Sequence, residues 1–310
     1  MFAHTTVLLE ETVDAVFTNP SGVYVDMTLG GGGHSAHLAE RLNEQGRLVG
    51  IDRDADALTA ARLRLASARC RIDLVQSNYL ELPQVLWQLD ISDVDGVMFD
   101  LGVSSYQLDT AERGFSYQHN GRLDMRMDQR DRVSAYEVVN TYTETRLADI
   151  IRKYGEEKWA KRISNYIVDA RQDRAIETTS ELVSIIKAAI PAGARRQGPH
   201  PAKRTFQALR IEVNGELQNL EKSIRQAIDV LHTGGRIAVI SFHSLEDRIV
   251  KQVFRELATG CICPPTFPVC TCCHKPTLKM VGKARRASLA ETQGNPRARS
   301  AILRVAEKLS

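Results

Sequence analysis

The stretch Val25-Asp26-Met27-Thr28-Leu29-Gly30-Gly31-Gly32-Gly33-His34-Ser35 decides the fold of this 310-residue chain. A strand-like apolar run ends in four consecutive glycines, after which a helical pattern begins. Glycine lets the backbone approach a ligand closely and adopt positive φ, and the N-terminus of the next helix offers unpaired N–H groups. The stretch therefore predicts a nucleotide-like cofactor held between a strand and a helix.

The spacing around the glycines distinguishes two kinds of cofactor. A dinucleotide loop requires G-x-G-x-x-G, but Ser35 occupies the third glycine position. Asp26 precedes Gly30, and this pattern resembles the D-x-G-x-G-x-G of methyltransferases that use S-adenosylmethionine (SAM), with Thr28 in the first glycine position. Asp52 ends the next predicted strand about 20 residues later, where a carboxylate can accept both ribose hydroxyls. The sequence favours SAM, and a simple surface turn is the alternative.

Strands and helices alternate between residues 23 and 100. The predicted strands are 23–28, 47–52, 71–76 and 94–100, and the predicted helices are 34–43, 55–66 and 80–89. This order is typical of an α/β fold, a doubly wound parallel sheet of the Rossmann-like kind. The glycines, Asp52, Tyr79 and Asp100 follow strand ends and should converge on one crevice. Tyr79 is there either a wall beside an adenine or a packing aromatic.

The alternation stops after about residue 109. Apolar residues then recur at helical spacing in segments 147–154, 159–170 and 182–190, and Thr178-x-x-Glu181 predicts a capping box. One long helix, 205–231, a strand, 236–242, and a closing strand near 300–305 are predicted to complete the sheet. We therefore assign residues 1–109 and 206–310 to a SAM-binding methyltransferase core and residues 110–205 to an inserted all-helical domain that recognises RNA.

Composition limits the class of protein. The chain is 43% hydrophobic and 25% charged, as globular proteins are. It has no run of about 18 apolar residues, and its N-terminus lacks a basic region before a hydrophobic segment. We expect a cytoplasmic protein without a membrane span; the oligomeric state is not predicted.

Positive charge is concentrated in two segments, although the net charge is only +3. Residues 191–210 contain five basic and no acidic residues, and residues 275–304 contain eight basic residues and one acidic residue. Such clusters suit a polyanion, but they also occur on ordinary solvated surfaces. Lys203, Arg204 and Phe206 combine cations with an aromatic ring, as RNA-binding segments do. We predict that these three side chains bind the substrate.

Asp100 is the candidate catalytic residue. It follows the fourth predicted strand, where methyltransferases of this architecture place the groups that meet the alkylated atom. A carboxylate that accepts one N–H of an exocyclic amine turns the nitrogen lone pair toward an electrophile. In the alternative, Asp100 only positions the amine or methyl group of the cofactor.

A second candidate group, residues 241–248, follows the resumed strand and returns to the same sheet edge. His243 offers ring nitrogens for hydrogen bonds and Phe242 offers a stacking face, so both suit contact with a base. The alternative is a helix N-cap at Ser244, with Asp247 three residues later. A Ser-His-Asp hydrolase is set aside because the chain lacks a G-x-S-x-G elbow.

Five of the six cysteines lie between residues 261 and 273. In a cytosolic chain, clustered thiols indicate a metal before a disulfide. Structural zinc usually uses C-x2-4-C, whereas Cys261 and Cys263, like Cys270 and Cys272, are separated by one residue. We therefore predict a reduced, proline-stiffened loop without a metal, and keep a bound metal as the alternative.

Long blocks of sequence resemble one known family. The blocks are residues 4–9, 30–35, 100–109, 112–116, 123–127, 154–157, 204–210, 241–248 and 295–300. Together they are similar to the ribosomal RNA small subunit methyltransferase H family. The resemblance implies SAM-dependent N4-methylation of a cytidine in the decoding centre of bacterial 16S rRNA, with the small ribosomal subunit as partner. It also implies cofactor contacts at Gly32, Gly33, His34, Asp52, Tyr79, Asp100 and Gln107.

Two departures and two other functions stay open. Gly31 stands where other members can carry a larger residue, so we expect a more mobile loop that still binds. Many amino-methyltransferases carry Asn-Pro-Pro-Tyr where this chain has Asp100-Leu101-Gly102-Val103, so analogy with them does not settle the role of Asp100. The other functions are a SAM-binding RNA-binding protein without turnover and a methyltransferase acting on DNA or protein amines.

Overall fold

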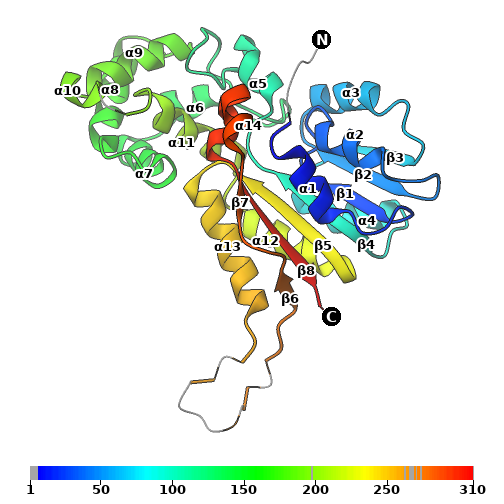
Figure 1. Cartoon of the computed structure of the whole chain (residues 1–310). Helices are drawn as coiled ribbons and strands as arrows, with labels where there is room; N and C mark the ends of the chain where they lie inside the picture. The colour runs from blue at the N-terminus through cyan, green and yellow to red at the C-terminus, as the bar shows by residue number, and fades with distance from the viewer. Residues whose placement is uncertain are drawn as a thin grey trace. The chain divides into compact units, whose positions relative to one another are not determined.

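The computed structural model describes residues 6–196, 198–261, 263–264, 269, 271–272 and 274–309. The chain divides into two compact units. The core unit comprises Met1–Gly102 and Leu217–Ser310, and the helical unit comprises Val103–Glu216. The chain leaves the core unit once and returns once (Figure 1). The predicted limits of the insertion, residues 110 and 205, both fall inside the helical unit.

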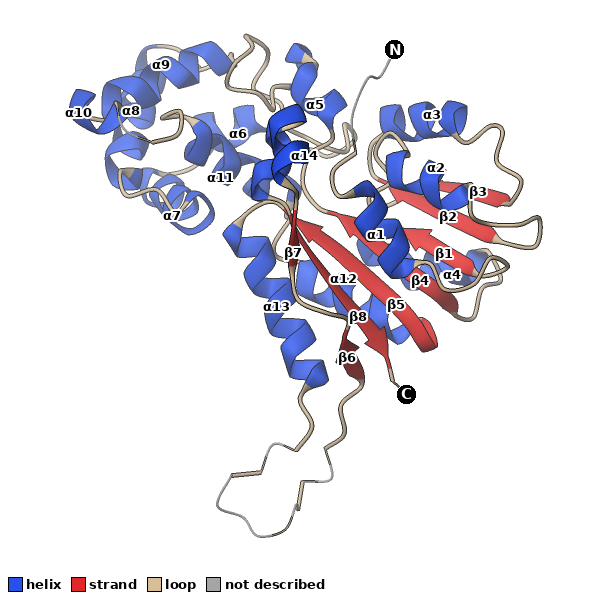
Figure 2. Ribbon diagram, in the orientation of Figure 1, coloured by secondary structure: helices blue, strands red, loops and turns tan. Residues whose placement is uncertain are grey.

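The core unit is a sheet with helices on both faces. Its strands are β1 (Val23–Asp26), β2 (Arg47–Asp52), β3 (Arg71–Gln76), β4 (Val94–Asp100), β5 (Leu231–Ser241), β6 (Leu278–Met280), β7 (Arg285–Arg286) and β8 (Ile302–Lys308). Its helices are α1 (Leu9–Val16), α2 (Gly33–Ala39), α3 (Ala55–Arg64), η1 (Tyr79–Glu81), α4 (Leu82–Gln88), α12 (Leu220–Asp229), α13 (Ser244–Ala258), α14 (Leu289–Gly294) and η3 (Pro296–Ser300). Figure 2 shows the strands in red between the helices.

The strand order confirms the predicted doubly wound fold. Within the described chain the order is β3-β2-β1-β4-β5-β8-β6, with β7 paired to β8. The first five strands pair in parallel, and β8 runs antiparallel to β5. The order reverses between β1 and β4, and ligands of such sheets bind beyond the carboxyl ends of the strands at this switch point.

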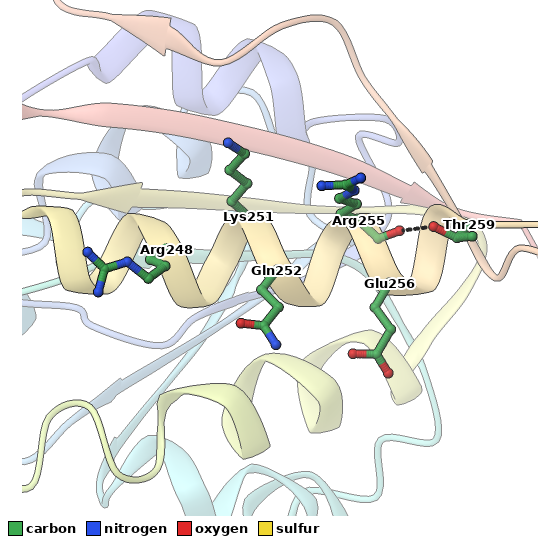
Figure 3. A pocket seen from close by; sticks show the side chains of 6 residues that line it. All are labelled: Arg248, Lys251, Gln252, Arg255, Glu256 and Thr259. Carbon is green, nitrogen blue, oxygen red and sulfur yellow. Dashed lines mark hydrogen bonds between the residues drawn. The ribbon is translucent and has the colours of Figure 1, made fainter. Parts of the chain in front are cut away.

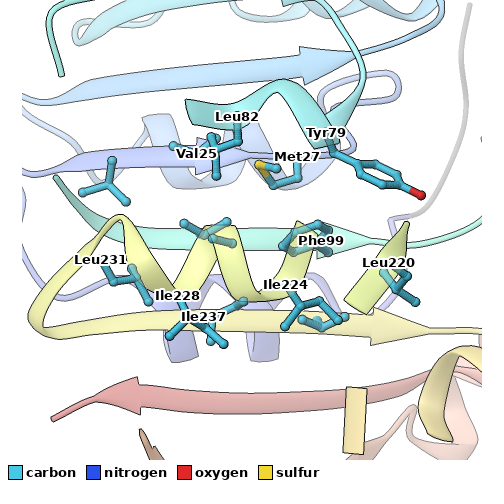
Figure 4. Packing of buried hydrophobic residues seen from close by; sticks show 14 of the residues in the cluster. Val25, Met27, Tyr79, Leu82, Phe99, Leu220, Ile224, Ile228, Leu231 and Ile237 are labelled. Atoms are coloured by element: carbon cyan, nitrogen blue, oxygen red, sulfur yellow. The ribbon is translucent and has the colours of Figure 1, made fainter. Parts of the chain in front are cut away.

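Alternation along the central strands divides the core between the two faces of the sheet. In β4, Val97 and Phe99 face one hydrophobic cluster, whereas Met98 faces the other. Ile224 and Ile228 of α12 pack on the first cluster (Figure 4). Each such fully buried side chain stabilises the fold by about 1.5–3 kcal/mol. The strands that carry the site are therefore fixed from both faces.

The helical unit contains no named strand in its described residues. Its elements are α5 (Ser105–Asp109), η2 (Ala111–Arg113), α6 (Ala135–Thr141), α7 (Glu144–Gly155), α8 (Ala160–Asp173), α9 (Thr179–Ala189), α10 (Ala192–Arg195) and α11 (Lys203–Asn214). Thr178 and Glu181 form the predicted capping box of α9. At the end of α7, a Cβ on Gly155 would lie 2.6 Å from the carbonyl oxygen of Arg204, so only glycine permits this approach of α7 to α11.

The prediction of a single long helix over residues 205–231 is wrong. The chain forms α11 and α12 instead, because Gly215 adopts a left-handed conformation with φ of 60° and caps α11. The N–H of Glu216 donates to the carbonyl oxygen of Ile211, which closes the helix end. The break falls at the limit between the two units. Apolar spacing alone did not show it.

The chain end also differs in detail from the prediction. The closing strand β8 starts and ends a few residues later than predicted, and the short strands β6 and β7 were not predicted. Lys279, Arg285 and Arg286 on these two strands are exposed, and charges on short edge strands oppose pairing with other chains. In the described part of the chain, no helix combines the length and the hydrophobicity needed to cross a membrane.

Removing a buried aromatic ring from β4 tests this packing. Phe99→Ala should lower the free energy of unfolding by about 3–5 kcal/mol, because Phe99 is fully buried and its loss leaves a cavity. Trp87→Ala is the control, since Trp87 is 79% exposed and should change stability by less than about 0.5 kcal/mol. Denaturant unfolding followed by circular dichroism measures both values. Equal losses in the two variants would contradict the assignment of the core.

Candidate active site

The glycine loop connects β1 to α2 at the switch point of the sheet. Gly30 and Gly32 have φ of 51° and 74°, in the left-handed region that favours glycine. A Cβ on Gly33 would collide with the hydroxyl oxygen of Thr6. A Cβ on Gly31 would meet no atom closer than 4.0 Å. The backbone path thus requires glycine at three positions and leaves room for a side chain only at Gly31.

Two carboxyl groups hold this loop in place. The Asp26 carboxylate accepts hydrogen bonds from Ser35 Oγ at 2.7 Å and from the N–H of Thr28 at 3.2 Å. The Asp52 Oδ2 accepts from the N–H of Gly30 at 2.7 Å. Burial raises the pKa of Asp26 and that of Asp52 to about 6. Asp52, predicted to bind the ribose, therefore also fixes the glycine loop.

Asp100 ends β4 next to this loop. Its backbone N–H donates to Thr28 Oγ1 at 2.6 Å, which ties the end of β4 to the residues after β1. Its side chain is 30% exposed, yet its Oδ1 is buried and has no hydrogen-bond partner among the described residues. A buried acceptor without a donor costs about 1–3 kcal/mol. An atom in this state is a candidate acceptor for a hydrogen bond from a ligand.

The surroundings of Asp100 disfavour its ionised form. Burial raises the pKa of Asp100 to about 8, and the nearby carboxyl groups of Asp26 and Glu246 add to the increase. At neutral pH the free protein therefore holds this carboxyl group mainly protonated. A cation bound beside Asp100 favours the carboxylate.

His34 lies behind Asp100. Its imidazole is 6% exposed, with Nε2 3.0 Å from the carbonyl oxygen of Val7 and Nδ1 3.7 Å from Asp100 Oδ2. A carbonyl oxygen can only accept, so we assign the proton of neutral His34 to Nε2. The lone pair of Nδ1 then faces Asp100. The predicted site residues Asp52, His34 and Asp100 thus lie around one sheet edge.

His243 forms the N-cap of α13, one residue before the cap proposed at Ser244. The N–H of Glu246 donates to His243 Nδ1 at 3.4 Å, and Glu246 Oε2 accepts from the N–H groups of Phe242 at 2.8 Å and His243 at 3.2 Å. Strand β5 neighbours β4, so this capping box lies at the same sheet edge as Asp100. Sequence reasoning missed Glu246. A capping-box search that admits His at the N-cap would have found it.

Tyr79 has the packing role that was one of its two predicted interpretations. It is 9% exposed and contacts Phe99 edge to face, with 6.3 Å between ring centroids. Its hydroxyl points away from the labelled Val25, Met27 and Leu82 (Figure 4). A contact between the Tyr79 ring and an adenine stays a prediction.

The remaining predicted residues belong to the helical unit. Gln107 is buried and completes the capping box of α5, in which its Oε1 accepts from the N–H of Ser104 at 3.0 Å. Lys203 and Arg204 are exposed in the first turn of α11. The prediction of an exposed stacking ring at Phe206 is wrong, because Phe206 is 3% exposed and packs edge to face against Tyr117. Its apolar neighbours on α11 place it in the core of this unit.

A groove along α13 adds a positive surface that sequence reasoning missed. Its lining residues are Arg248, Lys251, Gln252, Arg255, Glu256 and Thr259 (Figure 3). Arg248, Lys251 and Arg255 follow helical spacing and share one face. Glu256 accepts a hydrogen bond from Arg225 at 2.8 Å, so its charge is compensated from outside the groove. The helical spacing of these three cations in the sequence could have indicated this surface.

The fold and the position of the glycine loop make the chain a Rossmann-like protein, the class that binds a nucleotide-derived cofactor at the switch point of its sheet. Its family is narrower than this class. The chain belongs to the MraW methylase family, whose profile matches residues 1–309, and it is thus a methyltransferase.

Two proteins of similar sequence have the same name. A ribosomal RNA small subunit methyltransferase H of Brevibacillus brevis is 53% identical over 309 residues, covering 99% of this chain and 98% of the relative. A protein of the same name from Ruminiclostridium cellulolyticum is 51% identical over 311 residues, covering 99% of each. The crystal structure of an rRNA methylase from Streptococcus thermophilus matches with a TM-score of 0.42 and 12% identity, covering 100% of this chain and 99% of that one.

The raised pKa of Asp100 predicts a pH-dependent cost of folding. Between about pH 4, the pKa of an unfolded Asp, and the folded value of about 8, the folded chain holds one proton more, so its free energy of unfolding falls as pH rises. Asp100→Asn removes this loss. The variant should match the native chain in stability near about pH 4 and exceed it at about pH 9.

Denaturant unfolding of both proteins across this pH range measures the difference. Asp26 and Asp52 have folded pKa values of about 6 and lose stability in the same direction, but they are present in both proteins and cancel. A stability difference that does not change with pH would contradict the assignment.

Proposed function

We propose that this chain transfers a methyl group from SAM to the exocyclic N4 amine of a cytidine in 16S rRNA, in the cytoplasm. The observation that carries the proposal is the buried, unpartnered Oδ1 of Asp100 beside the glycine loop at the switch point. Membership of a methylase family and the name of the relatives support the reaction and the RNA substrate. The cytidine position follows from the resemblance of the sequence blocks.

The residues around the loop suit SAM, which supplies an electrophilic methyl group on a sulfonium. Gly32 and Gly33 bring the backbone close to the cofactor, Asp52 accepts from its ribose, and Tyr79 borders its adenine. His34 and Gln107 are the other proposed cofactor contacts. The orphaned acceptor on Asp100 fits this group because a cation favours its ionised form and an amine offers it a donor.

Asp100 acts on the incoming amine in our proposal. Its carboxylate accepts one N–H of the base, which turns the nitrogen lone pair toward the methyl group. After transfer the nitrogen loses a proton, and the raised pKa of Asp100 makes its carboxylate a suitable acceptor near neutral pH. The imidazole of His34 lies beside this carboxyl group, with Nδ1 3.7 Å from Asp100 Oδ2. In the alternative, Asp100 only positions the amino group of the cofactor.

The RNA is bound by exposed cations in the proposed function. Lys203 and Arg204 lie in the first turn of α11, and this first turn contains no acidic residue. Cations there oppose the helix dipole, a cost that a bound phosphate offsets. Arg204 Nη1 lies 3.9 Å from Glu157 Oε2. The Arg204 side chain is 46% exposed, so it can still reach a phosphate. His243 is the candidate contact to the base, and Phe206 supports α11 from inside.

Methyl transfer by the purified chain tests the reaction. With SAM carrying a labelled methyl group, nucleosides from 16S rRNA in assembled subunits should contain labelled N4-methylcytidine by mass spectrometry. Naked RNA and DNA are the comparison substrates. SAM binding without any transfer would favour an RNA-binding protein, and label in DNA or protein amines would favour the other alternative.

Variants of the two acids separate chemistry from cofactor binding. Asp100→Ala should lower kcat by about 10²–10⁴-fold, the usual contribution of a general base, with a smaller change in the Kd for SAM. Asp52→Ala should instead raise that Kd by about 10–100-fold, because a charged hydrogen bond is worth about 1.5–3 kcal/mol. Calorimetry and single-turnover kinetics measure the two quantities. A full kcat in Asp100→Ala would leave Asp100 as a cofactor contact only.

The contribution of α11 to RNA binding is tested by Arg204→Ala. We expect weaker binding and a salt-dependence slope smaller by about 1, since one phosphate contact is lost. Arg152→Ala is the matched control, because Arg152 is an exposed arginine beside an acid, Asp149, in the same unit. Filter binding at several salt concentrations measures the slopes. An unchanged slope in Arg204→Ala would assign the segment to solvated surface.

A further inference from the structure

Three thiols converge between α13 and β6. The Sγ atoms of Cys261, Cys263 and Cys272 all lie within 4.8 Å of one another. Cys261 and Cys263 lie near the start of the segment between the two elements, and Cys272 lies 9 residues after Cys263 in the sequence. Cys270 and Cys273, which the sequence places in the same cluster, lie outside the described residues.

The sulfur separations fit a tetrahedral metal better than a disulfide. Cys261 Sγ and Cys272 Sγ are 3.8 Å apart. A disulfide requires about 2.05 Å between sulfurs. Two thiolates at about 2.3 Å from a tetrahedral zinc ion lie about 3.8 Å apart, which is the separation found. The one-residue spacing within each Cys-x-Cys pair argued against zinc. The two sulfurs that lie 3.8 Å apart, however, belong to Cys261 and Cys272, which are 11 residues apart in the sequence.

Backbone and hydroxyl groups already donate to these sulfurs. The N–H of Thr271 donates to Cys263 Sγ at 3.3 Å, and the N–H of His274 donates to Cys272 Sγ at 3.5 Å. Thr271 Oγ1 lies 3.5 Å from Cys263 Sγ. Donors of this kind stabilise ionised ligands and orient them toward a metal. The cluster therefore has partners suited to thiolates as well as converging sulfurs.

The described part of this loop has little else to hold it. The loop is closed at its base by the N–H of Thr277, which donates to the carbonyl oxygen of Leu257 at 2.9 Å. Beyond that point its described segments extend past the ends of α13 and β6 (Figure 2). Val269 is 70% exposed, so it contributes little hydrophobic stabilisation. Metal binding supplies folding free energy directly, and it would add order to these described segments.

We propose that Cys261, Cys263 and Cys272 bind one structural zinc ion. Sulfur ligands exclude magnesium and calcium, which prefer oxygen, and a closed set of thiolates is typical of structural zinc. His274 is not part of this group of ligand atoms, and its Nδ1 lies 2.8 Å from the carbonyl oxygen of Gly260. The site lies apart from Asp100 and the glycine loop, and its role is to order the loop.

Elemental analysis of the untagged full chain tests the site. Protein purified from zinc-supplemented cells should retain about one equivalent of zinc after dialysis. Added to the metal-free chain, Co²⁺ should produce thiolate-to-cobalt charge-transfer absorption. Each of Cys261→Ser, Cys263→Ser and Cys272→Ser should weaken zinc binding by more than about 100-fold, since even partners behind a ligand contribute 10–100-fold.

Cys70→Ala is the matched control, because Cys70 is a free cysteine buried in the core unit away from the cluster. It should keep its zinc. Alkylation of Cys261, Cys263 and Cys272 provides a second readout that does not depend on how the variants fold, since a chelator should expose these thiols in the native chain. Absence of zinc from the native chain, copper in its place, or a Cys261–Cys272 disulfide under reducing conditions would overturn the proposal.

Discussion

The burial of a carboxyl group without a partner at the end of β4 is the constraint on which the site depends. Asp100 Oδ1 has no donor among the described residues, and its pKa rises to about 8 because of burial. The packing of Phe99 and Val97 on one face and of Met98 on the other fixes the backbone of β4, and with it the position of Asp100 at the end of the strand. The switch point of a parallel sheet is where ligands of such folds bind, and this position of Asp100 is the basis of the proposed function.

The fold was largely predictable because its signals are local. Alternating strands and helices, four glycines and acids at strand ends define a doubly wound sheet, and the structure contains it in that order. The capping box at Thr178 and Glu181 was equally predictable, since it depends on residues three positions apart in the sequence. The errors arose where a single conformation overrode a pattern. Gly215 at positive φ divides a helix whose apolar spacing looked continuous, and β6 and β7 are too short to show a period.

The candidate site was only partly predictable. Spacing and strand-end position identified Asp52 and Asp100, and the family resemblance supplied His34. Neither showed that Asp52 binds the N–H of Gly30 or that Glu246 lies close enough to raise the pKa of Asp100. These are tertiary contacts between strand ends that meet only in the folded sheet. Phe206 shows the converse error, because an aromatic beside cations resembles an RNA-binding surface in sequence whether its ring is exposed or buried.

The protonated state of Asp100 bears on how a ligand is held and released. In the proposed function, a positively charged donor bound beside Asp100 would replace the acidic hydrogen of its carboxyl group, so the net charge of the interior would change little on binding. The by-product of methyl transfer would lack the sulfonium charge, and Asp100 would then be protonated again from solvent or from the reaction. With this role, Asp100 would attract the charged reactant more strongly than the by-product, and the difference would favour departure of the by-product over its rebinding.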